Sequence, residues 1–409
     1  MTNWNNPWHR WLHTFCNWVF FDRVTVTGAE RLPVAGPVLL LGWHRNGAVD
    51  GFVYHQIAPR AVFMLAARLR RNPLGRLFFG GIEVVRPKDR APNPEAAETN
   101  AHALAQCVDL MRVGGALVVF PEGTSSLGPR HLPYKSGAAR LLLDYLEAPD
   151  AKPIQVVPLG IHYESPWTFR DRVEVLVGEP IPAELPAGLS PIGRLREVRR
   201  RIETGLDSVG VNVGTAEELD LIQRVAYTAT LGTDRSYART LKQLERGLPP
   251  RLVAGWRELE PELVGRRLWF HQGVPLFPMS HPLLYGVALG VFGVLTVPGV
   301  LLNLPPLVAG AWAGRCFPDG RNVIALWKLL VGVPALVLWN LVLLIVSAVT
   351  GHPLWFAAYA LATVVSLKLW YRVRKLAVAV HNAWFHPELY ARALAFRETV
   401  LREVPDERR

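Results

Sequence analysis

Two long apolar stretches, Trp327–Thr350 and Leu354–Tyr371, follow each other with just Gly351-His352-Pro353 between them. About 20 apolar residues are enough for a helix to cross the hydrocarbon core of a bilayer. The glycine and proline between the stretches are turn residues. The pattern therefore predicts a tight membrane hairpin of two helices, over residues 327–350 and 354–371.

Basic residues flank this hairpin on both sides. Arg321 and Lys328 lie at its start, and Arg372, Arg374 and Lys375 follow its end. Cytoplasmic flanks of membrane helices carry an excess of lysine and arginine. We therefore predict that both ends of the hairpin lie on the cytoplasmic side.

An earlier apolar stretch, Pro282–Ala313, is interrupted by Pro298 and by Pro305-Pro306. These prolines favour a broken hairpin over residues 282–313 that enters and leaves the membrane by one face. The alternative is a simple spanning helix, Leu283–Leu302. The sequence thus predicts a membrane region over residues 281–372, preceded by a polar helical segment (206–280) and followed by a helical tail (373–409).

Aromatic residues recur at helical spacing near the start of the chain. They are Trp4, Trp8, Trp11, Phe15 and Trp18. Tryptophan favours the boundary between membrane and water. Residues 1–29 are therefore predicted to contain an amphipathic helix in that interface, with packing on the following domain as the alternative. A secretory signal is not indicated, because no basic segment precedes a continuous apolar core.

The net charge is +11, although charged residues make up just 19% of the chain and hydrophobic residues 50%. A basic and apolar chain suits an anionic lipid surface or an anionic substrate. We find no nucleic-acid motif and predict no nucleic-acid partner. Three scattered cysteines, Cys16, Cys107 and Cys316, form neither a disulfide framework nor a zinc motif.

Residues 30–205 alternate between short β-branched runs and helix-like segments. This alternation predicts an α/β domain with a mixed, mostly parallel sheet. The predicted strands are Pro37–Gly42, Ala61–Ala67, Ile82–Val85, Ala116–Phe120, Ile154–Ile161 and Val173–Gly178, and the predicted helices are Pro94–Arg112 and Ser136–Leu146.

The segment LLLGWHRNGAVDGF places His44 and Asp50 six residues apart. On one helix they would point about 120° apart. They can touch if His44 lies in the loop after the first strand and Asp50 in the first turns of the next helix. Asp50 would then orient the imidazole, which acts as a general base. Half of a metal site and two turn residues without chemistry are the other interpretations.

Four more segments accompany this pair. They are GGIEVVRP (80–87), FPEGTSS (120–126), LPYKSGAARLL (132–142) and VVPLGI (156–161). Glu122 follows a strand, at the edge where open parallel sheets bind ligands. In order and spacing, residues 30–205 resemble the glycerolipid acyltransferase family. The layout is most similar to the fungal-type glycerol-3-phosphate and dihydroxyacetone-phosphate acyltransferases, which also carry membrane segments after the catalytic domain.

The resemblance implies a role for each matching residue. His44 would deprotonate the acceptor hydroxyl, with Asp50 as its partner. Arg86 would bind the acceptor phosphate, and Glu122 with Gly123 would hold the acceptor glycerol. A guanidinium is a suitable partner for a phosphate group.

Two further positions are candidate binding residues. Pro158 matches the block tied to the acyl-donor site, and Lys135 precedes a helix start, where phosphate contacts are common. Arg86 as a surface arginine, Pro158 as a strand breaker and Lys135 as a solvated lysine are the alternatives. The resemblance requires no metal and no redox cofactor; the co-substrate would be acyl-CoA or acylated acyl carrier protein (acyl-ACP).

Two departures from the family pattern stand out. Five residues, Arg45 to Val49, separate His44 from Asp50, where four are commonest. Ser125 stands where the bacterial third block has an arginine. Because that arginine is absent here, phosphate binding would fall to Arg86, Lys135 or Arg130.

The predicted function is a membrane-bound O-acyltransferase that transfers a fatty acyl group from a thioester to glycerol 3-phosphate or dihydroxyacetone phosphate in phospholipid synthesis. Acylation of 1-acyl-glycerol-3-phosphate is the close alternative. A non-catalytic lipid-binding protein, and a metal-dependent lipid hydrolase that also uses His162 and Asp144, are two others. Acyl thioesters are made in the cytoplasm, so we predict an integral cell-membrane protein with its catalytic domain on that side.

Overall fold

The computed structural model describes residues 6–85, 95–266 and 281–406. The chain divides into two compact units. The first unit comprises Met1–Asn17, Val24–His162 and Val175–Asn212, and the second comprises Trp18–Arg23, Tyr163–Glu174 and Val213–Arg409.

Seven strands form one sheet in the order β1-β7-β6-β2-β5-β3-β4. The strands are β1 (Phe21–Thr27), β2 (Val38–Gly42), β3 (Ala61–Ala66), β4 (Ile82–Val84), β5 (Ala116–Val119), β6 (Gln155–Tyr163) and β7 (Asp171–Val177). Strand β2 pairs in parallel with β5 and β6, and β3 pairs in parallel with β4 and β5. The prediction of a mixed, mostly parallel sheet is confirmed, and β1 is an additional strand.

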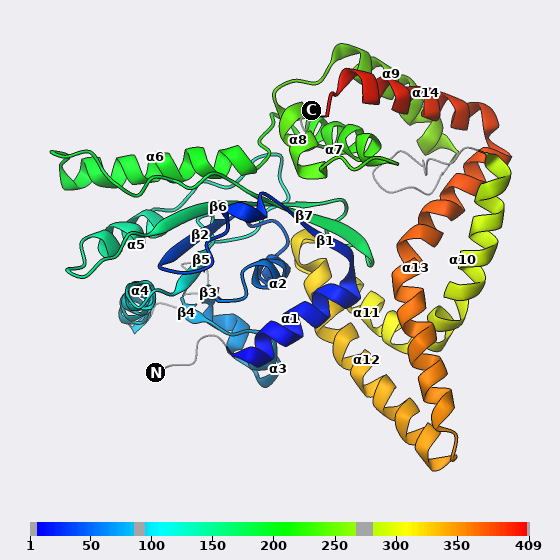
Figure 1. Cartoon of the computed structure of the whole chain (residues 1–409), viewed down its shortest axis with the longest axis horizontal. Coiled ribbons are helices and arrows are strands. Elements are labelled where there is room, and N and C mark those ends of the chain that lie inside the picture. Colours follow the sequence, from blue (N-terminus) through cyan, green and yellow to red (C-terminus); the bar gives the residue numbers. More distant parts are fainter. Residues whose placement is uncertain (1–5, 86–94, 267–280, 407–409) are drawn as a thin grey trace. The chain divides into compact units, whose positions relative to one another are not determined.

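Short apolar runs form the interior strands of the first unit. Every residue of β2 and of β5 is buried, as expected for parallel strands covered on both faces. The helices of this unit are α1 (Pro7–Phe20), whose last three residues belong to the second unit, α2 (Ala48–Ile57), α3 (Pro73–Phe78), α4 (Glu95–Arg112), α5 (Gly137–Leu146) and α6 (Pro191–Val209). Helix α4 packs on β4 and β5, and α4, α5 and α6 lie side by side (Figure 1).

Helix α1 buries a mixed face that includes three polar side chains, and it exposes tryptophan side chains. Trp8 and Trp11 are 41% and 56% exposed, whereas His9, His13 and Asn17 are buried. A helix in contact with water alone would do the reverse. The exposed tryptophans suit the interfacial helix, and the contacts of His13 with Phe78 and of Asn17 with Phe52 suit packing on the domain, so both stay predictions.

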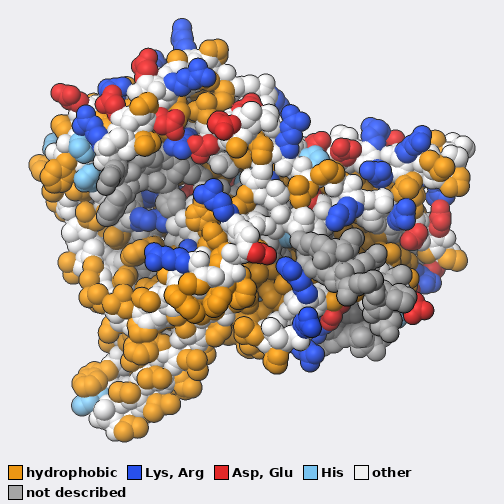
Figure 2. All heavy atoms as spheres, turned by 180° about the vertical axis from the view of Figure 1, so that it is seen from behind, with side chains coloured by type: hydrophobic (Ala, Val, Ile, Leu, Met, Phe, Trp, Pro, Cys, Tyr) orange, Lys and Arg blue, Asp and Glu red, His pale blue; other side chains and the backbone are white. Residues whose placement is uncertain are grey.

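The second unit is mainly helical. Its helices are α7 (Ala216–Thr230), α8 (Tyr237–Glu245), α9 (Pro250–Gly265), α10 (Pro282–Leu302), α11 (Leu304–Cys316), α12 (Ile324–Val349), α13 (Pro353–Phe385) and α14 (Pro387–Glu403). By length and composition, three segments of the described chain could cross a membrane: Leu283–Leu302, Arg321–Val349 and Pro353–Phe385. Hydrophobic side chains cover the α12–α13 hairpin (Figure 2).

The stretch over residues 282–313 forms two helices with different partners. Helix α10 continues through Pro298 and ends at Leu302, so the chain turns at Asn303. Helix α10 packs along α13, and α11 packs along α12 (Figure 1). The prediction that this stretch enters and leaves the membrane by one face stays a prediction.

Helix α13 continues beyond Tyr371, where the third apolar stretch ends, as far as Phe385. Two polar residues at the start of this extension have partners within the second unit. The Tyr371 hydroxyl lies 2.9 Å from Glu164 Oε2, and Arg374 Nη2 lies 3.3 Å from Asp171 Oδ1. These contacts keep the helix regular past the apolar stretch.

Candidate active site

The structure brings His44 and Asp50 together at the carboxyl end of β2. His44 lies in the loop after Gly42, and Asp50 lies in the first turn of α2. Gly47, with φ of 55°, allows the tight turn between them. His44 Nδ1 lies 2.9 Å from Asp50 Oδ2, and the aspartate is fully buried. This is the loop-and-helix contact that the sequence predicted.

The backbone holds the Asp50 carboxylate in place. Its Oδ2 accepts N–H groups from Arg45 at 2.6 Å and from Asn46 at 2.8 Å. A carboxylate accepts but does not donate, so His44 Nδ1 carries the proton toward Asp50. In the neutral imidazole, Nε2 is then the basic nitrogen. The pair can work as a general base with an oriented tautomer.

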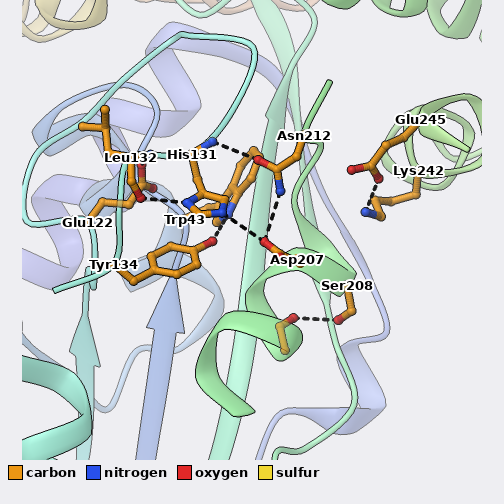
Figure 3. Close-up of polar contacts among 11 residues, drawn as sticks. Trp43, Glu122, His131, Leu132, Tyr134, Asp207, Ser208, Asn212, Lys242 and Glu245 are labelled. Atoms are coloured by element: carbon orange, nitrogen blue, oxygen red, sulfur yellow. Dashed lines mark hydrogen bonds and ion pairs between the residues drawn. The ribbon is translucent and has the colours of Figure 1, made fainter. Parts of the chain in front are cut away.

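Glu122 follows β5 and braces His44 through the backbone. Its Oε1 accepts the His44 N–H at 3.0 Å. Its Oε2 accepts the Leu132 N–H at 2.9 Å (Figure 3). Burial raises the pKa of the Glu122 carboxyl, although these two N–H groups oppose the shift. Both oxygens are therefore engaged with the main chain, which gives Glu122 a positioning role. Its predicted contact with the acceptor glycerol stays a prediction.

Gly123 and Lys135 lie against each other. Gly123 has φ of +69°, and a Cβ at this position would lie 2.6 Å from Lys135 Nζ. The Lys135 backbone N–H also donates to the Pro121 carbonyl at 2.9 Å. Glycine therefore lets the Lys135 ammonium approach the loop that carries Glu122. This places a positive charge beside the loop.

The remaining predicted site residues are Pro158 and Arg86. Pro158 is buried within β6, opposite Leu41 of β2, and its carbonyl accepts the Gly178 N–H at 2.9 Å. It is thus part of the sheet rather than of the loops that carry His44 and Glu122. Arg86 lies outside the described residues.

Arg45 is a site residue that the sequence reasoning did not single out. Its side chain is 7% exposed, and Nη2 donates to the Gly128 carbonyl at 2.9 Å. The guanidinium carbon lies 5.1 Å from the centre of the Trp43 ring. Burial lowers the pKa of Arg45, while Glu122 and Asp50 oppose the shift. Its place within the five-residue gap is the signal that could have identified it.

A polar network lies next to this loop (Figure 3). Trp43 Nε1 donates to the Tyr134 hydroxyl at 3.1 Å, and the Tyr134 ring stacks on His131 with 4.0 Å between centroids. His131 Nε2 lies 3.2 Å from Asp207 Oδ1, and Asn212 Nδ2 donates to the same oxygen at 3.1 Å. The network ties the end of β2 to the loop after β5 and to the end of α6.

The residues considered for a metal site are not assembled around His44. His162 Nε2 lies 2.8 Å from the Val209 carbonyl oxygen, and Asp144 is exposed on α5. Over residues 6–85, 95–266 and 281–406, no group of three or more histidine, cysteine, aspartate or glutamate side chains could hold a metal ion. His44 and Asp50 are thus placed as a pair.

Comparisons with known proteins point in one direction. Residues 23–162 match the family model described as Acyltransferase. The chain is 31% identical over 128 residues to glycerol-3-phosphate O-acyltransferase 2 of Saccharomyces cerevisiae. This match covers 30% of this chain and 17% of the relative. It is 24% identical over 297 residues to glycerol-3-phosphate O-acyltransferase 1 of the same yeast, which covers 50% and 39%.

A bacterial relative is similar over a comparable length. The chain is 27% identical over 128 residues to the 1-acyl-sn-glycerol-3-phosphate acyltransferase of Borreliella burgdorferi, which covers 31% of this chain and 48% of the relative. The matched parts span less than half the length of each of these three relatives.

Proposed function

We propose that this chain is a membrane-bound O-acyltransferase. The match of residues 23–162 to the acyltransferase family supports this proposal. It would move a fatty acyl group from an acyl thioester to a hydroxyl of a glycerol phosphate. The observation that carries this proposal is the 2.9 Å contact between His44 Nδ1 and Asp50 Oδ2. This contact fixes the orientation of the imidazole, and the hydroxyl of the substrate would be the nucleophile.

The proposed reaction begins with proton transfer. Nε2 of His44 takes the proton of the acceptor hydroxyl as the oxygen attacks the thioester carbonyl carbon. The carbon–sulfur bond of the tetrahedral intermediate then breaks, and the imidazolium returns its proton to the departing thiolate. Asp50 stabilises the imidazolium between these steps. An ester and a free thiol are the products.

Positive charge near His44 supports a phosphorylated acceptor. The Lys135 ammonium lies beside Gly123 in the loop that also carries Glu122. A phosphate there would form charge-assisted hydrogen bonds. We propose Arg86 as a second phosphate ligand, on the resemblance alone, and Pro158 as part of the acyl-donor side.

We propose glycerol 3-phosphate, or dihydroxyacetone phosphate, as the acceptor. The names of the two yeast relatives support glycerol 3-phosphate, and the longer yeast match covers half of this chain. Lysophosphatidate is the second candidate, supported by the name of the Borreliella relative. The three long apolar segments support an integral membrane location. We propose the cytoplasmic side for the domain, because acyl thioesters are made there.

One experiment tests the proposal. The purified full chain is incubated with acyl-CoA or acyl-ACP, radiolabelled in the acyl group, and with a panel of acceptors. The products are then identified. We expect lysophosphatidate from glycerol 3-phosphate, and loss of about 10²–10⁴ in turnover for His44→Ala. Chelators should leave turnover unchanged, whereas a metal-dependent hydrolase would lose it. A full chain that binds lipids but transfers no acyl group to any acceptor would contradict the proposal.

A further inference from the structure

The second unit contains a half-open cavity of about 300 Å³ that is lined by helices α10, α11, α12 and α13 and by Val19, Phe20 and Phe169. This volume is at the lower end of those of small-molecule sites. The walls are almost entirely apolar. A space of this kind suits a thin hydrocarbon ligand better than a polar metabolite.

Helices α11 and α12 line the cavity and pack closely against each other. Along α12, Lys328, Gly332 and Leu336 line the cavity once per turn, over about 12 Å of helix axis. Along α11, Leu307 and Gly310 line it. A Cβ on Gly310 would lie 3.4 Å from Gly332 Cα, so the two glycines let these helices approach closely. The cavity is thus elongated along α12.

The polar side chains in the walls bond to the protein itself. Asn303 Nδ2 donates to the Gly299 carbonyl at 2.8 Å and to Thr363 Oγ1 at 2.8 Å. Ser366 Oγ donates to the Thr296 carbonyl at 2.7 Å. A water molecule needs two or more polar partners to remain in such a site. The walls therefore present mainly C–H groups to an occupant.

Positive charge lies at the Lys328 end. Lys328 Nζ donates to the Trp167 carbonyl at 2.7 Å, and the Arg321 guanidinium lies 4.8 Å from the centre of the Trp167 ring. An ammonium carries three N–H donors, so Lys328 can bind an anion in addition to this carbonyl. Hydrocarbon walls with an ammonium at one end match a chain that has an anionic head group.

We propose that this cavity binds one single-chain lipid with an anionic head group. The head group contacts Lys328, and the acyl chain runs along α12 toward Leu336. Free fatty acids and lysophosphatidate share this chemistry. The volume accommodates one chain, so a two-chain phospholipid would leave its second chain outside. The inference rests on the second unit alone and does not require acyl transfer at His44.

The test uses photolabelling of the full chain in detergent with a diazirine-bearing palmitic acid, followed by peptide mapping. We expect saturable labelling of α11 and α12 that excess palmitic acid suppresses. Leu336→Trp fills the cavity and should lower labelling about tenfold or more. Leu338→Trp lies on the same helix but is 63% exposed, so it should label like the wild type. Leu307→Trp fills the cavity independently, in case Leu336→Trp does not fold.

Competition identifies the head group. Palmitic acid should compete better than its neutral alcohol, and Lys328→Met should remove that difference. A stronger competition by lysophosphatidate than by palmitic acid would assign the phosphate head group, and the reverse would assign the carboxylate. Equal labelling of the Leu336→Trp, Leu307→Trp and Leu338→Trp variants would overturn the proposal. His44→Ala should lose turnover but keep labelling, which separates this site from the transfer reaction.

Discussion

Asp50 Oδ2 lies 2.9 Å from His44 Nδ1 and accepts two backbone N–H groups at the same time. The oxygen has no place for another donor, so an amide in its position would disturb the whole arrangement. The histidine tautomer therefore depends on one buried carboxylate.

Asp50→Asn should lower kcat by about 10²–10⁴ while the protein remains folded. An amide NH2 facing Nδ1 would favour the tautomer with the proton on Nε2, which cannot act as a base. Turnover of labelled thioester at saturating acceptor measures the effect. Asp144→Asn on the exposed side of α5 is the matched control. Turnover of Asp50→Asn within about threefold of the control would remove the orienting role.

Glu122→Gln should lower kcat about tenfold or more and leave the acceptor KM nearly unchanged. Its two oxygens accept the His44 and Leu132 N–H groups, and a glutamine NH2 would face one of these donors. Glu147→Gln, exposed on the surface, serves as the control. A selective rise in acceptor KM would instead support the contact with the acceptor glycerol that the family resemblance implies.

Lys135→Ala should raise the acceptor KM about tenfold or more, because a phosphate would lose a charge-assisted bond worth about 1.5–3 kcal/mol. The donor KM should change little. Initial rates over both substrate concentrations separate these effects, and Lys152→Ala, also exposed, is the control. If both KM values rise equally, Lys135 maintains the loop around Gly123 rather than binding phosphate.

Local sequence patterns predicted six of the seven strands of the sheet, all except β1, and the contact between His44 and Asp50. Both depend on short-range features: apolar runs, a turn, and two residues six apart. The network of Trp43, Tyr134, His131 and Asp207 was not predictable, because its members come from segments far apart in the chain and share no spacing rule.

The end of α13 shows the same limit. Arg372, Arg374 and Lys375 read as a boundary after an apolar stretch, yet the helix continues to Phe385. Arg374 pairs with Asp171, which is about 200 residues earlier in the chain. The local pattern contains the charges but not the partners that accommodate them.

Acid should destabilise the first unit through His13 and His55. Their Nδ1 atoms lie 2.8 Å apart, and His13 Nε2 lies 2.8 Å from the Phe78 carbonyl oxygen. Burial lowers the pKa of His13 to about 3 and that of His55 to about 4, against an ordinary 6.5. Both are therefore neutral when folded. Their contribution to stability is complete above pH 6.5 and is lost as pH falls toward 4.

The loss amounts to about 1.4 kcal/mol per pH unit for each histidine. Thermal unfolding of the full chain in detergent, followed between pH 7.5 and 5, measures it. His13→Gln should weaken the pH dependence, and His102→Gln, exposed on α4, should not. An unchanged pH dependence in His13→Gln would assign the acid sensitivity to other groups.

Single cysteines introduced near Thr2, Arg315 and Arg409, in a background without the three native cysteines, should all react from the cytoplasmic side. The basic flanks of the α12–α13 hairpin and the polar segment over residues 206–280 motivate this expectation. A membrane-impermeant maleimide on whole and permeabilised cells gives the readout. Labelling of the Arg315 site from outside would show that Leu283–Leu302 simply crosses the membrane.

The Trp43 ring occupies the space where a side chain at position 210 would begin. A Cβ on Gly210 would lie 2.0 Å from the Trp43 ring atoms Cε2 and Cζ2. Because the ring is buried and its Nε1 donates to Tyr134, it cannot swing aside without breaking that bond. The residues at positions 43 and 210 should therefore vary together among homologues. Homologues with a larger residue at position 210 should carry a smaller one at position 43. A change at just one of the two positions should be rare.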